Sequence, residues 1–243
     1  MESFVNQPFL DKRRKWASWA SYAGLAALFA GILTATRSLL ISYLCLMLGV
    51  IAASIGAYLS NRYVREPRGD QVLTRTLEGL DKRYALYSYY LSTAHVIASH
   101  FGLMVVATRP QKGQVGFADG KWQHRARWRF VTQFLGEPSI GRPELTVRDD
   151  VESLEQWVAS ALPGEEHVPV NGLVLFTNPD VELDAADAPI KALKTNDLAA
   201  YLRTGLKGQP VLSTSRQKEL RRLLDGVVEA SAAEAQTKGK RKA

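Results

Sequence analysis

The chain has 243 residues, a formal net charge of +7 and 46% hydrophobic residues. These averages are those of an ordinary globular protein, and they exclude disordered, collagen-like and disulfide-rich chains. Cys45 is the single cysteine, which excludes an intramolecular disulfide and a cysteine-based zinc site. The apolar residues are unevenly distributed, because Arg37 is the only charged residue between Trp16 and Leu59. The sequence therefore divides into an apolar N-terminal part and a charged C-terminal part.

Two apolar stretches, residues 16–36 and 38–59, predict two transmembrane helices joined by a very short turn. Each has about 20 residues, the length needed to cross a hydrocarbon core of roughly 30 Å. Small residues recur at spacing four in the second stretch, as in Gly49, Ala53 and Ala57, and predict close helix contact. Two other interpretations stay open. The first stretch has features of a cleaved signal peptide, and both stretches fit buried helices of a soluble protein.

Basic residues gather at one end of this predicted hairpin. Residues 12–15 read KRRK, and the second stretch is followed by Arg62, Arg65 and Arg68, whereas Arg37 lies at the other end. Cytoplasmic flanks of membrane helices carry the excess of Lys and Arg. We therefore expect a two-pass integral membrane protein, with the lipid bilayer as a partner and with both termini and the soluble domain in the cytoplasm.

The expected organisation has four parts. Residues 1–15 form a basic cytoplasmic N-terminus, and residues 16–59 form the membrane hairpin. Residues 61–230 form a cytoplasmic domain, and residues 231–243 form a polar, basic tail that we expect to be disordered.

Within the cytoplasmic domain, apolar runs of four to eight residues predict strands. The expected strands are residues 84–91, 95–99, 103–108, 114–117, a strand around 122–130, 172–177 and 190–193. Hydrophobic residues at helical spacing predict helices. The expected helices are residues 70–83, a helix at 149–162 capped by Asp149 or Asp150, a helix from Thr195 or Asn196 to Arg203, and residues 213–233. This order predicts an α/β (or α+β) domain with a mixed sheet flanked by helices.

Two segments of this domain resemble a known family. Residues 68–88 read RGDQVLTRTLEGLDKRYALYS, and residues 94–115 read AHVIASHFGLMVVATRPQKGQV, followed by Gly120, Lys121 and Trp122. Their spacing and apolar pattern resemble those of the nuclease-related domain (NERD) family. The resemblance covers roughly residues 68–203 and is strongest before Trp122. It implies a restriction-endonuclease-like core.

The polar signature of that family is degraded here. Its members have a Gly-Glu before the first helix, and the matching carboxylate in this sequence is Asp70. An Asp-His opens a strand in the family, whereas this sequence has Ala94 before His95. The family's Glu-x-Lys corresponds to Ala107, Thr108 and Arg109. Ala94 and Ala107 are thirteen residues apart, as the family pattern requires.

In such nucleases the acidic residues hold a divalent metal that activates water and neutralises phosphate charge. With two of the three carboxylates replaced, we expect no metal site, no cofactor and no confidently assigned catalytic residue. Asp70 has a second interpretation as the N-cap of its helix, and His95 as a structural histidine. Mg²⁺ or Mn²⁺ is expected only under the alternative of an active nuclease with a rearranged site.

A basic stretch suggests where nucleic acid would bind. Its members are Arg109, Lys112, Lys121, Arg125, Arg127 and Arg129. They predict a phosphate-facing surface, although a β-hairpin with a solvated basic face has the same pattern. We therefore expect a membrane-anchored, non-catalytic binding or scaffolding module, with nucleic acid as one candidate partner. The alternatives are the active nuclease and a scaffold for membrane proteins that has no nucleic-acid role. The sequence does not indicate an oligomeric state.

Overall fold

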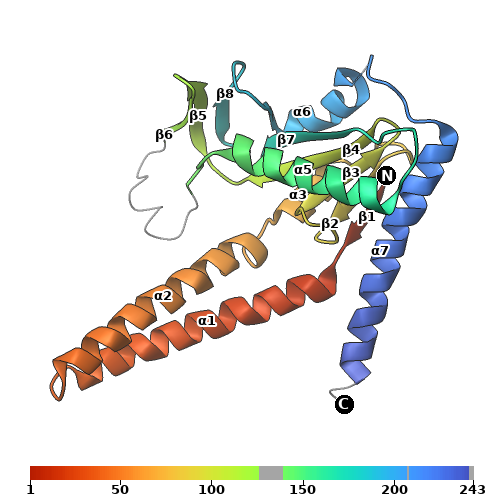
Figure 1. Cartoon of the computed structure of the whole chain (residues 1–243). Coiled ribbons are helices and arrows are strands. Elements are labelled where there is room, and N and C mark those ends of the chain that lie inside the picture. The colour runs from red at the N-terminus through yellow and green to blue at the C-terminus, as the bar shows by residue number, and fades with distance from the viewer. Residues whose placement is uncertain (126–138, 207, 241–243) are drawn as a thin grey trace. The chain divides into compact units, whose positions relative to one another are not determined.

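The computed structural model describes residues 1–125, 139–206 and 208–240 (Figure 1). The chain forms two compact units. Gln7–Arg68 belong to a helical hairpin, and Met1–Asn6 join residues 69–125, 140–206 and 208–240 in an α/β domain. The N-terminal residues and the rest of the domain are thus separated in sequence by the hairpin.

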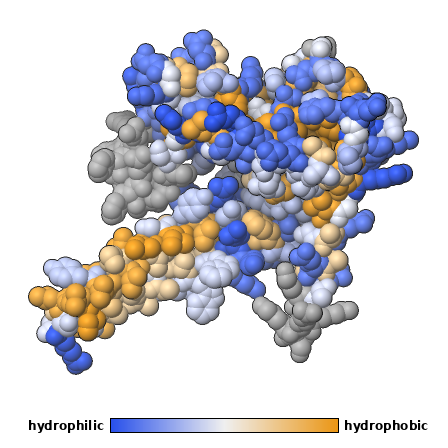
Figure 2. All heavy atoms as spheres, viewed as in Figure 1, coloured by the Kyte–Doolittle hydropathy of each residue, from blue (hydrophilic) through white to orange (hydrophobic). Residues whose placement is uncertain are grey.

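The hairpin consists of α1 (Gln7–Thr34) and α2 (Leu39–Tyr63). Both helices are long and apolar enough to cross a membrane, and Figure 2 shows apolar residues along the hairpin. The outward side chains are large, with Trp19 and Leu33 each more than 70% exposed. Helix α1 begins well before the predicted span at residue 16, because the basic residues 12–15 continue the same helix.

The two helices pack along a seam of mostly small residues at spacing seven. The buried residues are Leu10, Ala17, Gly24 and Gly31 on α1, and Ser42, Gly49, Gly56 and Tyr63 on α2. A Cβ atom on Gly24 would lie 2.5 Å from the backbone nitrogen of Ala53. The Ser42 hydroxyl donates a 2.7 Å hydrogen bond to the carbonyl of Gly31. The close contact predicted from small residues at spacing four is confirmed for Gly49 and Ala53, which both lie against Gly24. The most buried residues of the seam repeat every seven residues, as in helices that wrap around each other.

A six-stranded mixed sheet forms the centre of the α/β domain. From edge to edge its strands are β1 (Glu2–Val5), β2 (Ala85–Ser88), β3 (His95–Ser99), β4 (Gly102–Arg109), β7 (Val170–Phe176) and β9 (Lys191–Lys194). Strand β3 is antiparallel to both of its neighbours, and the other pairs are parallel. The mixed sheet flanked by helices is the predicted coarse fold.

A second sheet has three strands in the order β6-β5-β8. They are β5 (Gly113–Ala118), β6 (Lys121–Arg125) and β8 (Val181–Asp184). Strand β5 follows β4, and β8 follows β7, after a short bend in each chain segment. Hydrogen bonds from Thr177 N to Arg109 O and from Gly113 N to Asp180 O join the two segments at the bend. The parallel pairing of β4 with β7 is therefore carried on into β5 and β8.

Helices cover both faces of the large sheet. On one face, α3 (Gly69–Thr76), α6 (Thr195–Ala200) and one π-helical turn, η1 (Tyr201–Gly205), bury Leu73, Leu198 and Leu202 against Ile97 and Val106. On the other face, α5 (Pro143–Ala161) and α7 (Thr214–Lys240) supply the residues buried against Val96, Leu103 and Val105. Residues that alternate along β3 and β4 thus point to opposite faces, as strand geometry requires.

Several helix ends differ from the sequence predictions. Helix α3 ends at Thr76 rather than at residue 83. Helix α5 begins at Pro143, not after Asp149, because proline is well suited to the first helical position. Helix α7 continues to Lys240, where we expected a disordered tail from residue 231. The alanine-rich segment after Val228 has a high helix propensity and prolongs the packed part of α7.

Strands β1 and β8 were not predicted. Strand β1 lies in the segment that we assigned to a separate basic N-terminus of residues 1–15, and β8 has only four residues. Both are edge strands, and half of each strand's residues are exposed. Short edge strands carry a weak apolar signal because one backbone edge has no partner strand.

Candidate functional site

Buried polar side chains gather where α3 meets β2, β3 and β4. We name Asp70, Ser88, Tyr89, His95 and Thr108 the polar cluster. Asp70 and His95 are each 2% exposed, and Ser88 is fully buried. Asp70 lies in the first turn of α3, where the helix dipole favours a negative charge. The cluster includes Asp70, the carboxylate that the sequence resemblance retains.

The members of the polar cluster contact one another. His95 Nδ1 lies 3.0 Å from Ser88 Oγ, and the Tyr89 ring meets the His95 ring edge-on at 5.1 Å. The Tyr89 hydroxyl is oriented to donate to Asp70 Oδ1 at 3.5 Å, a weak contact. A Cβ atom on Gly69 would lie 2.7 Å from Thr108 Oγ1 and 2.9 Å from His95 Nε2. The start of α3 therefore approaches β3 and β4 closely, and glycine at position 69 permits this approach.

Tyr89 has a backbone conformation that tyrosine rarely adopts. Its φ angle is +65°, in the left-handed region. Its amide donates a 2.8 Å hydrogen bond to the carbonyl of Ala94, and its carbonyl accepts a 3.1 Å bond from Asn6 Nδ2. Strained residues of this kind persist only where their surroundings hold them, and they concentrate at functional sites. Tyr89 makes the polar cluster the strongest site candidate among the described residues.

Two of the positions that correspond to the family's polar signature, Ala107 and Arg109, lie on the other face of the sheet. The β3–β4 register runs from Ser99 with Gly102 to Val96 with Val105, and Ala94 lies just before β3, outside this register. Ala107 is buried with Val174 and Phe176 near α5. Arg109 is two residues further along β4, so strand alternation directs it to the same face as Ala107. The structure thus places Ala107 and Arg109 on the face opposite to Asp70.

The donor set of the polar cluster does not fit a magnesium or manganese site. The cluster offers one carboxylate, Asp70, and one imidazole whose Nδ1 faces Ser88. In the ranges that the structure describes, no three His, Cys, Asp or Glu side chains gather as metal ligands. Magnesium requires near-octahedral oxygen ligands. Asp119 lies in the turn between β5 and β6 and is not a member of the cluster.

Four of the six residues of the predicted basic surface lie in the described part of the chain. Lys112, Lys121 and Arg125 are exposed on or next to the β5–β6 hairpin, whereas Arg109 is half-buried at the end of β4. Arg127 and Arg129 lie outside the described residues. Lys121 and Arg125 share the outward face of the small sheet, because Trp122 and His124 between them point inward.

Strand β8 brings acidic residues to this same outward face. The register places Glu182 beside Gln114, which pairs with Arg125 on its other side. Gln114 Nε2 donates a 3.1 Å hydrogen bond to Glu182 Oε2. Asp184 lies next to Gly116 in the same way. The outward face of the small sheet therefore carries both signs of charge, which could not be foreseen from the sequence without strand β8.

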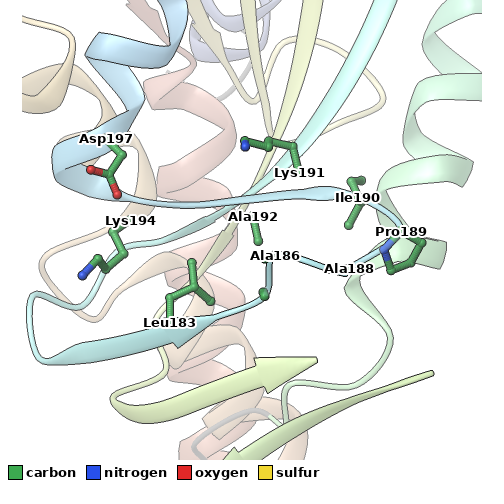
Figure 3. A pocket seen from close by; sticks show the side chains of 10 residues that line it. Leu183, Ala186, Ala188, Pro189, Ile190, Lys191, Ala192, Lys194 and Asp197 are labelled. Atoms are coloured by element: carbon green, nitrogen blue, oxygen red, sulfur yellow. The ribbon is translucent and has the colours of Figure 1, made fainter. Parts of the chain in front are cut away.

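Two shallow hollows adjoin this face. The larger, about 550 Å³, lies over β5, β6 and β8 and includes Arg125, Glu182 and Asp184. The smaller, about 350 Å³, is lined by the alanine-rich segment between β8 and β9 and by residues of β9. Figure 3 shows Ala192 and Lys194 on one side of β9 and Lys191 on the other. Neither hollow is lined by Asp70 or His95, so both are separate from the polar cluster.

Three pKa shifts mark structural contacts outside the cluster. Burial raises the pKa of Tyr87, whose hydroxyl donates to Asp225 at 2.9 Å. Burial and the nearby Arg83 lower the pKa of His100, at the far end of β3. Hydrogen bonds from Ser213 lower the pKa of Glu166. The contacts of Tyr87 and Glu166 hold α7 and the residue before it, and none of the three groups belongs to the polar cluster.

Comparison with protein families, with curated proteins and with solved structures finds no match for this chain.

Of the residues in and beside the polar cluster, sequence reasoning singled out Asp70 and, as a structural histidine, His95, but not Ser88, Tyr89 or Asn6. A serine inside the otherwise apolar run ALYS is the one local signal that could have indicated Ser88. The role of Tyr89 depends on its backbone conformation, and that of Asn6 depends on β1. Neither feature is visible in the composition or spacing of the sequence.

Proposed function

We propose that this protein is a membrane-anchored, degenerate member of the nuclease-related domain family that binds or scaffolds without catalysis. The observation that carries this proposal is the apolar environment of Ala107, which is buried with Val174 and Phe176. The resemblance predicts a carboxylate at this position and another at Ala94, just before β3. Two acids on neighbouring strands would share a metal ion, and two alanines bind none.

The hairpin supports membrane anchoring. Its outward face is covered by large apolar side chains, while its small residues face inward. The chain enters the hairpin from β1 and leaves it toward α3, and both elements belong to the α/β domain. Both ends of the hairpin are therefore on the domain's side of the bilayer, and their basic flanks favour the cytoplasm.

We propose nucleic acid as the first partner to test, through Lys121 and Arg125. Each lysine or arginine that contacts a phosphate releases counterions, so binding weakens steeply with salt. The double variant Lys121→Glu, Arg125→Glu is expected to lose affinity for single- and double-stranded DNA and RNA. Its salt slope is expected to fall by about two, one for each phosphate that the variant no longer neutralises.

The control variant is Lys82→Glu, which changes the charge of the full chain at an exposed residue outside the small sheet. Gel shifts of the full chain in detergent micelles measure all three proteins. Equal affinity and equal salt slope for the double variant and the control would contradict the phosphate-contact role of the small sheet.

A protein scaffold is the second candidate function. Glu182 and Asp184 favour it, because they place carboxylates beside Arg125 on one face, and carboxylates repel phosphates. A mixed-charge surface suits a protein partner of complementary charge. Capture of membrane proteins by the wild type, abolished in Glu182→Lys and kept in Lys82→Glu, would select this function.

A further inference from the structure

The first strand of the domain precedes the membrane hairpin in the chain. Strand β1 pairs in parallel with β2 over four residues, from Glu2 with Ala85 to Val5 with Ser88. Parallel strands need a long crossover connection. Here the crossover contains α1, α2 and α3. Helix α1 begins directly after Asn6, without a linker.

Side chains and the terminal amine hold β1 at several points. The Met1 ammonium group donates a 2.8 Å hydrogen bond to the carbonyl of Leu80. The hydroxyls of Ser3 and Thr74 lie 2.9 Å apart. Because Leu80 follows α3 and Thr74 lies in it, the N-terminus is tied to the segment that comes after the hairpin.

Strand β1 is also tied to the C-terminal helix. Glu2 forms an ion pair with Arg221 of α7, and Arg221 Nε lies 3.4 Å from Asp225 Oδ1. The Phe4 ring stacks on the Tyr87 ring with their centroids 5.1 Å apart. The Tyr87 hydroxyl donates to Asp225. These contacts join β1, β2 and α7 in one network.

The last residue before the hairpin reaches the polar cluster. Asn6 is 9% exposed, and its Nδ2 donates to the carbonyl of Tyr89 at 3.1 Å and to Ser231 Oγ at 3.1 Å. Its own amide donates to the carbonyl of Ser88. Gly69, the first domain residue after the hairpin, lies against His95 and Thr108. Both chain connections of the hairpin therefore end at the polar cluster.

We propose that Met1–Asn6 act as a topological lock. The domain completes its sheet and its polar cluster only when both membrane helices have crossed and the chain has returned to the side where it began. A chain with one crossing helix leaves β1 and β2 on opposite sides of the bilayer, so they cannot pair. The lock rests on the proposed membrane anchoring, and it is independent of any nuclease ancestry or nucleic-acid binding.

A cross-link first tests whether β1 is seated in full-length chains. Ser3→Cys and Thr74→Cys, in a Cys45→Ser background, place two thiols where the hydroxyls now lie 2.9 Å apart. Membrane-integrated chains that carry these three substitutions and an otherwise unchanged hairpin are expected to form this disulfide under mild oxidation. Failure to form it would overturn the proposal, because β1 would not be docked in the membrane-bound protein.

A single-crossing variant then tests the lock. Leu48 and Ile51 are lipid-facing, about 58% and 50% exposed, near the middle of α2. Arginine at both positions opposes insertion of α2, and Leu48→Ala with Ile51→Ala is the matched control. Protease added to one side of the vesicles identifies membrane-integrated chains whose ends lie on opposite sides.

In those chains we expect no disulfide to form and the domain to be digested at least ten times faster than in the control. Digestion follows the population of the open domain. A domain that resists protease equally well with its N-terminus on the other side would overturn the lock.

A second pair of variants tests the link to the polar cluster. Asn6→Ala removes the hydrogen bond to Tyr89, whereas Ser231→Ala removes the bond that Asn6 donates to Ser231 and keeps the one to Tyr89. The His95 imidazole resonance is expected to shift in Asn6→Ala and to stay within its linewidth in Ser231→Ala. An unchanged His95 signal in folded Asn6→Ala would overturn the part of the proposal that concerns the cluster.

Discussion

Gly69→Ala perturbs the polar cluster with the smallest change that the chain allows. The added Cβ atom would lie 2.7 Å from Thr108 Oγ1 and 2.9 Å from His95 Nε2. Both distances are shorter than van der Waals contact, so either α3 or these two side chains must shift. Overpacking of this kind costs about 1–3 kcal/mol. For a domain of this size the melting temperature is expected to fall by about 2–12 °C.

Thermal unfolding of the full chain in detergent micelles, followed by near-ultraviolet circular dichroism, measures this loss. Thr108→Ala removes the side-chain atoms nearest the new methyl group. The double variant Gly69→Ala, Thr108→Ala is therefore expected to be more stable than the sum of the single effects by about 0.5–3 kcal/mol.

The control is Gly226→Ala, where a Cβ atom on α7 meets open space. This variant is expected to be as stable as wild type or up to about 1 kcal/mol more stable, because alanine favours helices over glycine. Strict additivity of Gly69→Ala and Thr108→Ala would refute the close approach of α3 to β4. So would a Gly69→Ala protein that melts at the wild-type temperature.

Two further predictions concern the hairpin and the pH dependence of stability. Gly49→Leu is expected to force α1 and α2 apart, so spin labels on the two helices should separate, whereas labels in the lipid-facing control Val50→Leu should not. Ser213 lowers the pKa of Glu166 below its ordinary value of 4.5, so the stabilisation is present above that value and is lost as the pH falls through the lower native pKa. Ser213→Ala should therefore melt at a lower temperature near neutral pH and show a smaller further fall in acid. A melting temperature that falls equally steeply in both proteins between about pH 5 and pH 3 would contradict this assignment.

The sequence predicted elements whose signal is local. The apolar run before Ser99 and the run before Arg109 were placed within one residue of β3 and β4. The buried strand β7 was likewise found from a continuous apolar run. Each of these strands is buried on both faces, so nearly all of its side chains are apolar and the strand forms a continuous apolar run in the sequence.

Elements whose stability comes from distant partners were missed. Strand β1 is fixed by Arg221, more than two hundred residues away in the chain. Strand β8 depends on its parallel pairing with β5. The spacing-seven seam of the hairpin depends on how the two helices wrap around each other, not on either sequence alone. Long-range pairing therefore accounts for what the local patterns did not reveal.

The candidate site was likewise predicted only where the signal is local in the sequence. The family resemblance pointed to Asp70 and predicted the loss of two carboxylates. It did not indicate that Arg109 and Asp70 lie on opposite faces of the sheet, because that follows from the alternation of β4 and the packing of α3. The mixed charge beside Arg125 equally required strand β8.

A cleavage assay on the full chain in lipid nanodiscs tests the proposed loss of catalysis most directly. Labelled single- and double-stranded DNA and RNA are incubated with the protein in Mg²⁺, Mn²⁺ or EDTA. A non-catalytic domain predicts intact substrates under every condition, with the same result for wild type and Asp70→Ala. Cleavage that EDTA abolishes and that Asp70→Ala removes would contradict the proposal and would require a second metal-binding carboxylate close to Asp70.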